Sequence, residues 1–318
     1  MDATRRFLAS MGLPPGDSHD LPSSSKRFPD GAQYRVELPS TEGPAALAAI
    51  IDEADNLDVT IHRVSQGSGV MMLTDNEIGE MAQLAHARGM EVSLFARPNA
   101  AWDTGAMAVA SGGKTVGPRL RGQDQLVYCL EDVRRAAELG IRSVLLADEG
   151  ALWVAGEMRS QGELPAAMQF KISVMMASAN PAAIRLMERL GADTFNIPTD
   201  LSLAQIAAIR QAVDIPLDIY VEAPDDLGGF VRLYEIPELV RIAAPVYIKF
   251  GLRNAPNIYP VGAHIASLAV ALSRERVHRA KLGLDILHRY YPEAVMSQLG
   301  AEGLALPVLT DGGDSHEN

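Results

Sequence analysis

The sequence repeats one pattern eight times, a short β-prone run followed by a stretch with helical periodicity. The clearest run is Leu217-Asp218-Ile219-Tyr220-Val221-Glu222, in which aliphatic and polar residues alternate. Successive side chains of a strand point to opposite faces, so the aliphatic residues share one face and the polar residues share the other. If helices cover the aliphatic face, the polar face lines a closed interior. The pattern therefore predicts a barrel with charged side chains inside it.

Eight such units predict a (β/α)8 TIM barrel of the α/β class. Barrels of this kind occupy about 250 residues or more as one domain, which suits a chain of 318 residues. We expect an irregular N-terminal arm over residues 1–31, the barrel over 32–306 and a disordered tail over 307–318. The last helix, from about Ala263 to Tyr290, is expected to be long. The expected strands lie near residues 33–38, 58–64, 90–96, 141–148, 168–175, 193–197, 216–222 and 245–250.

Composition limits the class of protein. The single cysteine, Cys129, excludes an internal disulfide and any multi-cysteine metal site within this chain, so no iron–sulfur cluster is expected. No apolar run approaches membrane-spanning length, and we expect a cytoplasmic protein without a membrane partner. A formal net charge of -12 disfavours binding to nucleic acid. The expected partner is a small-molecule substrate, and the sequence is compatible with a homo-oligomer.

Strand alternation also predicts which polar side chains point inward. Applied to all eight runs, it gives Arg35, Glu37, Thr60, His62, Glu91, Ser93, Arg142, Asp148, Lys171, Ser173, Thr194, Asn196, Asp218, Tyr220, Glu222, Tyr247 and Lys249. In α/β barrels the amino ends of the strands serve stability and the carboxyl ends form the active site. The residues expected to form a supporting ion network at the amino ends are Arg35, Glu91, Arg142, Lys171 and Asp218. Those expected at the mouth are Glu37, His62, Asp148, Asn196, Glu222 and Lys249.

The mouth residues combine carboxylates, an imidazole, an amide and an amine, a set that suits acid–base catalysis or a divalent cation. The candidate catalytic residues are Glu37, His62, Glu222 and Lys249. The candidate ligands for a divalent metal are Asp148, Glu149 and Glu222. The alternative for the charged residues is a satisfied buried network, and a single strand-end histidine is as often a hydrogen-bonded core residue. A desolvated Lys249 also suits a Schiff base with a carbonyl substrate, although nearby carboxylates would keep it charged.

Loops at the carboxyl ends supply candidate substrate contacts. With the strand residue Asn196, they are Arg97, Trp102, Arg253, Asn254 and Tyr259. The connection from Pro98 to Gln123 far exceeds an ordinary loop of about 2 to 6 residues, and we expect a lid over the mouth. A subunit contact or a disordered insertion is the alternative. Gly67 and Gly69 offer backbone N–H groups to an anion, although an ordinary turn is the simpler interpretation.

Four short motifs follow one another between residues 180 and 223. They are Asn180-Pro181, Leu190-Gly191-Ala192-Asp193, Leu201-Ser202-Leu203-Ala204-Gln205-Ile206 and Asp218-Ile219-Tyr220-Val221-Glu222. In this order they resemble the collagenase-like peptidase family U32, which implies the barrel fold and a hydrolase. The family usually has Glu where Asp218 stands and His-Gly where Glu222-Ala223 stand, followed by a cysteine-rich segment. Here residues 224–230 contain no cysteine, so the iron–sulfur-linked hydroxylation of some members is not expected.

These observations predict a barrel enzyme that acts on a small polar substrate at the mouth. The resemblance favours a hydrolase that uses acid–base carboxylates or a divalent metal. The residues alone are equally compatible with a lyase or isomerase, aldolase-like through Lys249. A noncatalytic barrel that binds a ligand is the third alternative.

Overall fold

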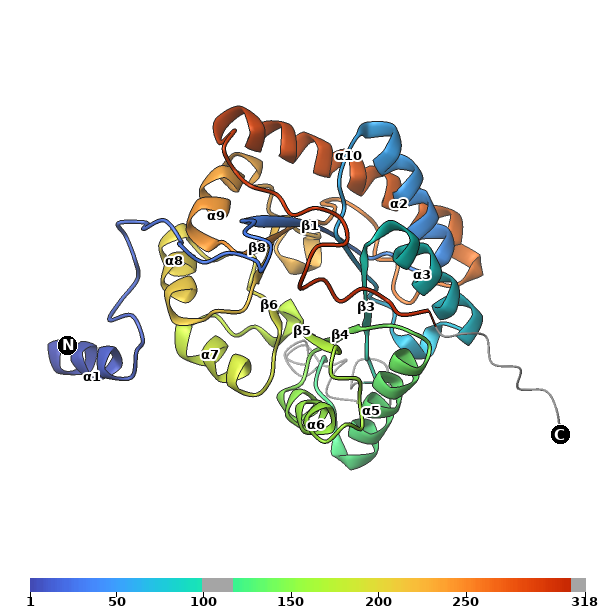
Figure 1. Ribbon diagram of the computed structural model, residues 1–318, viewed down its shortest axis with the longest axis horizontal. Coiled ribbons are helices and arrows are strands. Elements are labelled where there is room, and N and C mark those ends of the chain that lie inside the picture. Colours follow the sequence, from blue (N-terminus) through green and yellow to red (C-terminus); the bar gives the residue numbers. More distant parts are fainter. Residues whose placement is uncertain (99–116, 310–318) are drawn as a thin grey trace.

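A computed structural model describes residues 1–98 and 117–309 of the chain. Eight parallel strands close into a barrel in chain order, with helices around the outside (Figure 1). The strands are β1 (Tyr34–Pro39), β2 (Arg63–Ser65), β3 (Glu91–Phe95), β4 (Ser143–Leu146), β5 (Gln169–Ile172), β6 (Thr194–Asn196), β7 (Leu217–Glu222) and β8 (Val246–Phe250). The predicted (β/α)8 barrel is confirmed. Each strand overlaps a predicted run, but β2 is shorter and begins later than expected.

The helices bury their apolar sides against the aliphatic outer face of the barrel. They are α2 (Pro44–Leu57), α3 (Asp75–Arg88), α5 (Gly122–Glu138), α6 (Glu149–Ser160), α7 (Pro181–Arg189), α8 (Leu203–Ala212), α9 (Ile236–Ala243) and α10 (Ala266–Tyr290). Thr74 with Glu77 forms a capping box at the start of α3, and Asn180 caps α7 with its side-chain oxygen. The long last helix is also confirmed. It packs along α2, so the final helix closes the ring against the first barrel helix (Figure 1).

The N-terminal arm contains a helix that the sequence analysis missed. Helix α1 (Asp2–Ser10) has no buried residue and lies away from the barrel in Figure 1. The segment after it runs along the barrel wall, where the backbone N–H of Ser18 donates to Ala204 O at 3.1 Å. Ser24 N likewise donates to Arg241 O at 2.9 Å. The arm is therefore attached along α8 and α9.

Residues 292–309 cross the amino ends of the strands, as the red segment after α10 shows in Figure 1. Ser297 N donates to Tyr34 O at 3.2 Å, Gly300 N to Gly89 O at 2.9 Å, and Val308 N to Gly140 O at 2.8 Å. These contacts reach β1 and the turns that enter β3 and β4. The segment therefore covers the amino end of the barrel. The predicted disordered tail begins within it, and residues 310–318 lie outside the described part of the chain.

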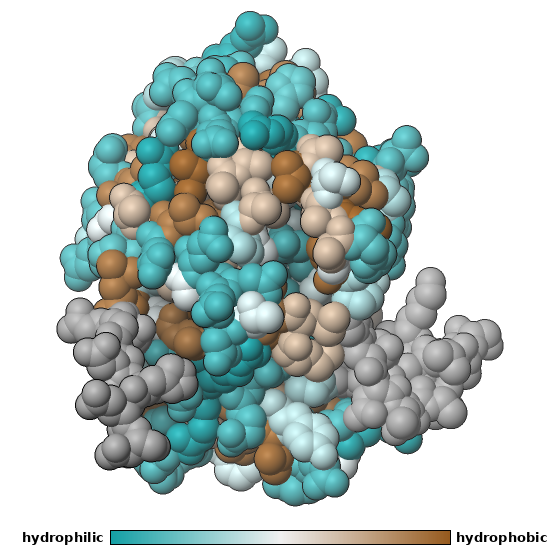
Figure 2. Space-filling view, turned by 90° about the vertical axis from the view of Figure 1, so that its right-hand side faces the viewer, coloured by the Kyte–Doolittle hydropathy of each residue, from teal (hydrophilic) through white to brown (hydrophobic). Residues whose placement is uncertain are grey.

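Figure 2 shows one face of the molecule, on which hydrophobic residues are interspersed with hydrophilic ones. Within the described ranges, no helix combines the length and the apolarity that a membrane crossing requires.

Candidate functional site

The centre of the barrel holds a cluster of ion pairs, which we call the central ion network. Glu37 accepts from Arg63 Nη2 at 2.6 Å and from Lys171 Nζ at 2.7 Å, and its other oxygen lies 3.0 Å from Lys249 Nζ. Asp218 pairs with both Arg63 and Lys171. The five side chains are at most 2% exposed. Each carboxylate has at least two cationic partners, as buried charges require.

Electrostatics hold these groups in defined protonation states. Burial disfavours the charged form of Glu37, but Arg63, Lys171 and Lys249 outweigh it and hold the pKa of Glu37 well below its ordinary value. Burial likewise opposes the charge of Arg63, while Asp218 and Glu37 raise its pKa well above the ordinary value. Burial, together with the charge of Arg63, lowers the pKa of Lys171 to about 8. Glu37 is therefore ionised at neutral pH.

Strand β2 lies one residue out of the predicted register. Arg63 and Ser65 face the interior, whereas His62 lies at the amino end of the barrel. Nδ1 of His62 accepts from Val36 N at 3.0 Å, and its Nε2 donates to Ser297 O at 2.9 Å. Burial lowers the pKa of His62 to about 4, so its ring is neutral at pH 7. The prediction that His62 faces the mouth is wrong, and His62 is a structural residue.

The alternation predicted for β4 is also wrong. Ser143 and Leu145 occupy the inward positions, while Arg142 donates to two preceding backbone carbonyls at 2.8 Å each. Asp148 lies beyond the strand and caps α6, because its carboxylate accepts from two N–H groups of the first turn at 2.9 and 3.1 Å. Arg142 therefore lies outside the central ion network and Asp148 outside the mouth.

The three predicted metal ligands do not meet. Asp148 caps a helix, and Glu149 pairs with Arg119 on the surface. Glu222 follows a register shift in β7; one of its oxygens accepts a backbone N–H at 2.9 Å and the other lies 3.2 Å from Arg279 Nε. Within residues 1–98 and 117–309, no group of three or more His, Cys, Asp or Glu side chains is placed to hold a metal ion. The metal centre predicted from these residues is wrong for this set.

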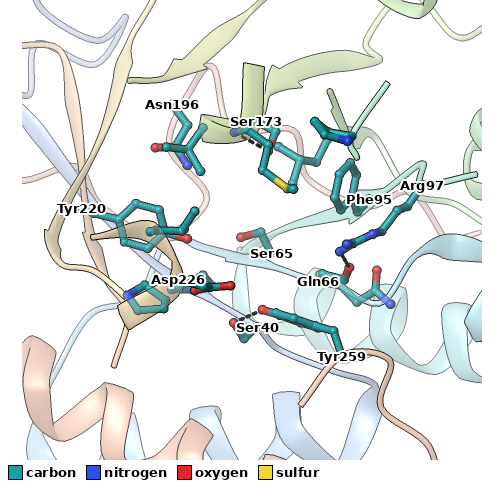
Figure 3. A pocket seen from close by; sticks show the side chains of 18 of the residues that line it. Ser40, Ser65, Gln66, Phe95, Arg97, Ser173, Asn196, Tyr220, Asp226 and Tyr259 are labelled. Carbon is teal, nitrogen blue, oxygen red and sulfur yellow. Dashed lines mark hydrogen bonds between the residues drawn. The ribbon is translucent and has the colours of Figure 1, made fainter. Parts of the chain in front are cut away.

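A cavity of about 850 Å³ opens at the carboxyl ends of the strands, above the central ion network. Polar side chains from β2, β6, β7, β8 and the loops after β3 and β8 point into it (Figure 3). The polar residues used below are Ser65, Arg97, Asn196, Tyr220, Asp226, Lys249 and Tyr259. The cavity has the volume of an ordinary ligand pocket and the position expected for an active site in this fold.

Lys249 connects the cavity to the central ion network. Its Nζ pairs with Glu37 and lies 4.5 Å from the centre of the Tyr220 ring. With the Asn196 amide oriented so that its oxygen faces Lys249, that oxygen accepts from Nζ at 3.0 Å and the amide nitrogen donates to Asp218 O at 3.1 Å. An ammonium group carries three N–H donors. Asn196 accepts one of them and Glu37 is the ion-pair partner 3.0 Å away, so among the described residues Nζ keeps donor capacity for a ligand in the cavity.

Arg97 supplies a second positive charge on the cavity wall. Its Nη1 donates to Gly67 O at 2.8 Å, and its guanidinium lies 5.2 Å from the centre of the Phe95 ring and 6.0 Å from that of Tyr259. Burial lowers the pKa of Arg97 to about 10, so the charge persists at neutral pH. The hydroxyl of Tyr259 hydrogen-bonds to Ser40, and burial raises the pKa of Tyr259.

The glycine-rich turn after β2 is occupied by the chain itself. Glu42 accepts from Gly67 N at 2.7 Å and from Ser68 N at 3.0 Å, and Gln66 accepts from Gly69 N at 3.0 Å. Burial raises the pKa of Glu42. The turn therefore offers no free N–H group to an anion at these positions, and the simpler interpretation as an ordinary turn is confirmed.

The cavity brings together some of the predicted site residues. Those that line it are Arg97, Asn196, Lys249 and Tyr259, and Glu37 lies directly beneath Lys249. Arg253 and Asn254 lie outside the lining, and Asn254 N donates to Asp225 at 2.5 Å. Trp102 and residues 99–116 of the predicted lid lie outside the described residues. The sequence analysis missed Arg63 and Ser65, although Arg63-Val64-Ser65 does alternate polar and apolar residues.

The chain was compared with known proteins. The family model described as Peptidase family U32 matches residues 45–223, more than half of the chain. No curated protein matches. Among solved structures, the U32 peptidase Mk0906 is 18% identical, with 63% of this chain and 73% of that chain covered and a TM-score of 0.38.

Two further solved structures illustrate the spread of such matches. The putative copper homeostasis protein CutC from Streptococcus agalactiae is 13% identical, with 68% of this chain and 98% of that chain covered and a TM-score of 0.43. A putative lyase/mutase from Burkholderia cenocepacia J2315 is 14% identical, with 92% and 91% covered and a TM-score of 0.45. These likenesses indicate no substrate and no mechanism.

Proposed function

Because the chain belongs to peptidase family U32, we propose that the cavity is the active site of a hydrolase that cleaves a C–N bond in a small molecule. One observation carries this proposal. The Lys249 ammonium is fixed at the cavity floor by its ion pair with Glu37 and its hydrogen bond to Asn196, and it retains donor capacity for a substrate oxygen. A fixed donor in a desolvated site is the arrangement that stabilises a developing oxyanion.

Lys249 acts as the electrophilic group in this proposal. The carbonyl oxygen of the scissile bond accepts a hydrogen bond from Nζ, and its negative charge grows as water attacks the carbonyl carbon. Glu37, 3.0 Å from Nζ, keeps the ammonium in place without touching the substrate, so it is a positioning residue. Ser65 donates to the same carboxylate at 2.7 Å and restricts its rotation.

Asp226 is the proposed general base. It belongs to η4 (Asp225–Leu227), and its side chain lies in the cavity beside Tyr220 and Ser40 (Figure 3). Asp226 accepts a proton from the attacking water and returns it to the leaving nitrogen as the C–N bond breaks. The products are a carboxylic acid and an amine, and no further reactant is required.

The test is a survey of dipeptides and N-acyl amino acids with product detection by mass spectrometry, followed by variants with the best substrate. We expect Lys249→Met to lower kcat/KM by roughly 10²- to 10³-fold, the usual effect of losing an oxyanion donor. Asp226→Asn should lower it by about 10²-fold or more. Asp225→Asn is the matched control: it lies next in sequence, outside the cavity lining, and should stay within a few-fold of wild type. Unchanged turnover in Lys249→Met would refute the proposal.

The same amine at the cavity floor favours a second candidate, a lyase or isomerase that forms a Schiff base through Lys249. This mechanism needs the free amine, which the adjacent Glu37 carboxylate opposes. Borohydride trapping with pyruvate and related carbonyl compounds distinguishes the two candidates. A covalent adduct at Lys249, and at no other lysine, would favour the lyase. A noncatalytic binder would instead show ligand affinity that depends on Lys249, with no turnover of any compound tested.

A further inference from the structure

One wall of the cavity is apolar. Phe95 at the end of β3, Leu145 in β4 and Met175 in η3 (Val174–Met176) line the cavity and pack against one another. Figure 3 shows Phe95 on the side of the cavity opposite Tyr220 and Asp226. Apart from Arg97 and Ser173, the polar and charged side chains come from β2, β6–β8 and the loops after β1, β2, β7 and β8, whereas the wall of Phe95, Leu145 and Met175 comes from β3, β4 and the turn after β5. The cavity is therefore divided into a polar side and an apolar side.

The apolar wall is a local exception in this barrel. Lys171 of β5 belongs to the central ion network. Leu145 is its partner in register on the neighbouring strand β4, and it presents an apolar side chain to the cavity instead. Phe95 and Leu145 are already 3% and 7% exposed and Met175 is partly buried, so what remains exposed of these side chains faces the cavity. It gains burial when an apolar group of a ligand covers it, and pockets of this type combine such a wall with a few fixed polar groups.

The cavity volume argues in the same direction. At about 850 Å³ the cavity lies in the upper part of the range for drug-sized ligands, roughly 300–1,000 Å³. A small molecule bound only by Lys249, Asn196 and their neighbours would make no contact with the cavity-facing atoms of Phe95, Leu145 and Met175.

We propose that the substrate is amphipathic: a carbonyl or carboxylate group accepts from Lys249, and a compact aliphatic or aromatic group packs against Phe95, Leu145 and Met175. This inference rests on the proposed function for the identity of the site. It replaces the wholly polar substrate that the sequence analysis predicts.

The test measures binding rather than turnover, with 3-phenylpropionate and propionate as probes in titration calorimetry. Both probes carry one carboxylate, and they differ by a phenyl ring. We expect 3-phenylpropionate to bind about 10- to 100-fold more tightly, the ratio expected for burying an aromatic side chain. Met175→Ser and Leu145→Ala should each reduce this ratio several-fold. Lys249→Met should weaken both probes by a similar factor and leave the ratio unchanged.

The sequence offers a matched control. A second Val-Met-Met turn, η1 (Val70–Met72), carries Met71 at the position equivalent to Met175, and Met71 lies outside the cavity lining. Met71→Ser should leave both affinities at wild-type values. The inference would be overturned if wild type bound the two probes equally or bound neither. It would also be overturned if the ratio of the two affinities were unchanged in both Met175→Ser and Leu145→Ala. If wild type binds 3-phenylpropionate more tightly than propionate by the expected factor but cleaves no C–N bond, the proposed hydrolase is refuted and the amphipathic site is retained.

Discussion

Replacing Arg63 with methionine tests whether the central ion network stabilises the barrel. Arg63 is fully buried, donates to Glu37 at 2.9 and 2.6 Å, pairs with Asp218 and lies 3.5 Å from Glu91. Its guanidinium also lies 3.5 Å from the centre of the Tyr247 ring. Methionine keeps much of the volume and removes the charge. Glu37 and Asp218 then remain buried with the lysines as their only cationic partners among the described residues.

The structure sets the size of the effect. Removing one partner of a buried ion pair costs about 3–5 kcal/mol, because it leaves an uncompensated buried charge. Total stabilities are about 5–15 kcal/mol, so a loss of this size is a large fraction. In domains of this general size each kcal/mol shifts the melting temperature by roughly 2–4 °C, which gives an expected drop of about 6–20 °C.

The assay is urea unfolding at pH 7, with thermal unfolding by circular dichroism as a second measurement. Arg63→Met leaves three buried carboxylates, Glu37, Glu91 and Asp218, with two lysines, so Arg63→Met/Asp218→Asn should recover part of the loss by removing one of these negative charges. Arg88→Met is the control, because Arg88 pairs with Asp55 on the surface and exposed pairs contribute about 1 kcal/mol or less. A loss below about 1 kcal/mol in Arg63→Met, or a double variant less stable than the single one, would refute the reasoning.

The pH dependence has a defined sign. The pKa of Glu37 in the folded state lies well below the ordinary value of 4.5, so its contribution to stability is present above pH 4.5 and is lost as the pH falls. Arg63 supplies part of this depression. The stability difference between wild type and Arg63→Met should therefore be largest at neutral pH and narrow below about pH 4.5.

Three further predictions follow from individual contacts. Gly67→Ala should lower the melting temperature and disturb the cavity, because a Cβ there would lie 2.5 Å from Tyr259 Cε1. The control is Gly79→Ala, which places a Cβ in open space within α3 and should stabilise the protein by about 0.5–1 kcal/mol. Equal effects of the two variants would contradict the prediction. Asp148→Ala should cost about 1 kcal/mol as a lost helix cap, and chelator treatment of wild type should not reproduce that cost, as it would for a metal ligand. The pKa of Lys171 falls from 10.5 to about 8 on folding, so wild type should gain stability relative to Lys171→Met as the pH rises from about 8 to 10.5. Denaturant titrations across this pH range measure the difference in unfolding free energy between the two proteins, and a difference that falls with pH would contradict the prediction.

The fold followed from the sequence because most strands carry a clear alternation. In β7 and β8 polar and aliphatic residues alternate, so Asp218, Tyr220 and Lys249 were correctly assigned to the interior. In β4 the residues are almost all apolar, and in β2 only three residues pair, so neither pattern fixed the face. A shift of one residue exchanges the two faces of a strand, which is why His62 was selected in place of Arg63.

The site was predicted in part for the same reason. Lys249 and Asn196 follow from strand parity and position, which are local properties of the sequence. Asp148 carried a second signal, since an aspartate at a strand-to-helix junction is a preferred N-cap residue. The occupation of the Gly67 turn by Glu42 depends on contacts across 25 residues, and no local pattern indicates it.

The segment that crosses the amino ends also constrains the order in which the molecule can be completed during synthesis. Tyr34 in the first strand hydrogen-bonds to Ser297, so this contact of β1 forms only after a residue much later in the sequence has been made. Until then the Arg35 guanidinium, which donates to Ser297 Oγ at 2.9 Å and to Glu302 O at 2.6 Å, lacks both partners. The amino end of the barrel is therefore completed only after residues 292–309 have left the ribosome, and contacts between residues so far apart in sequence are expected to form slowly.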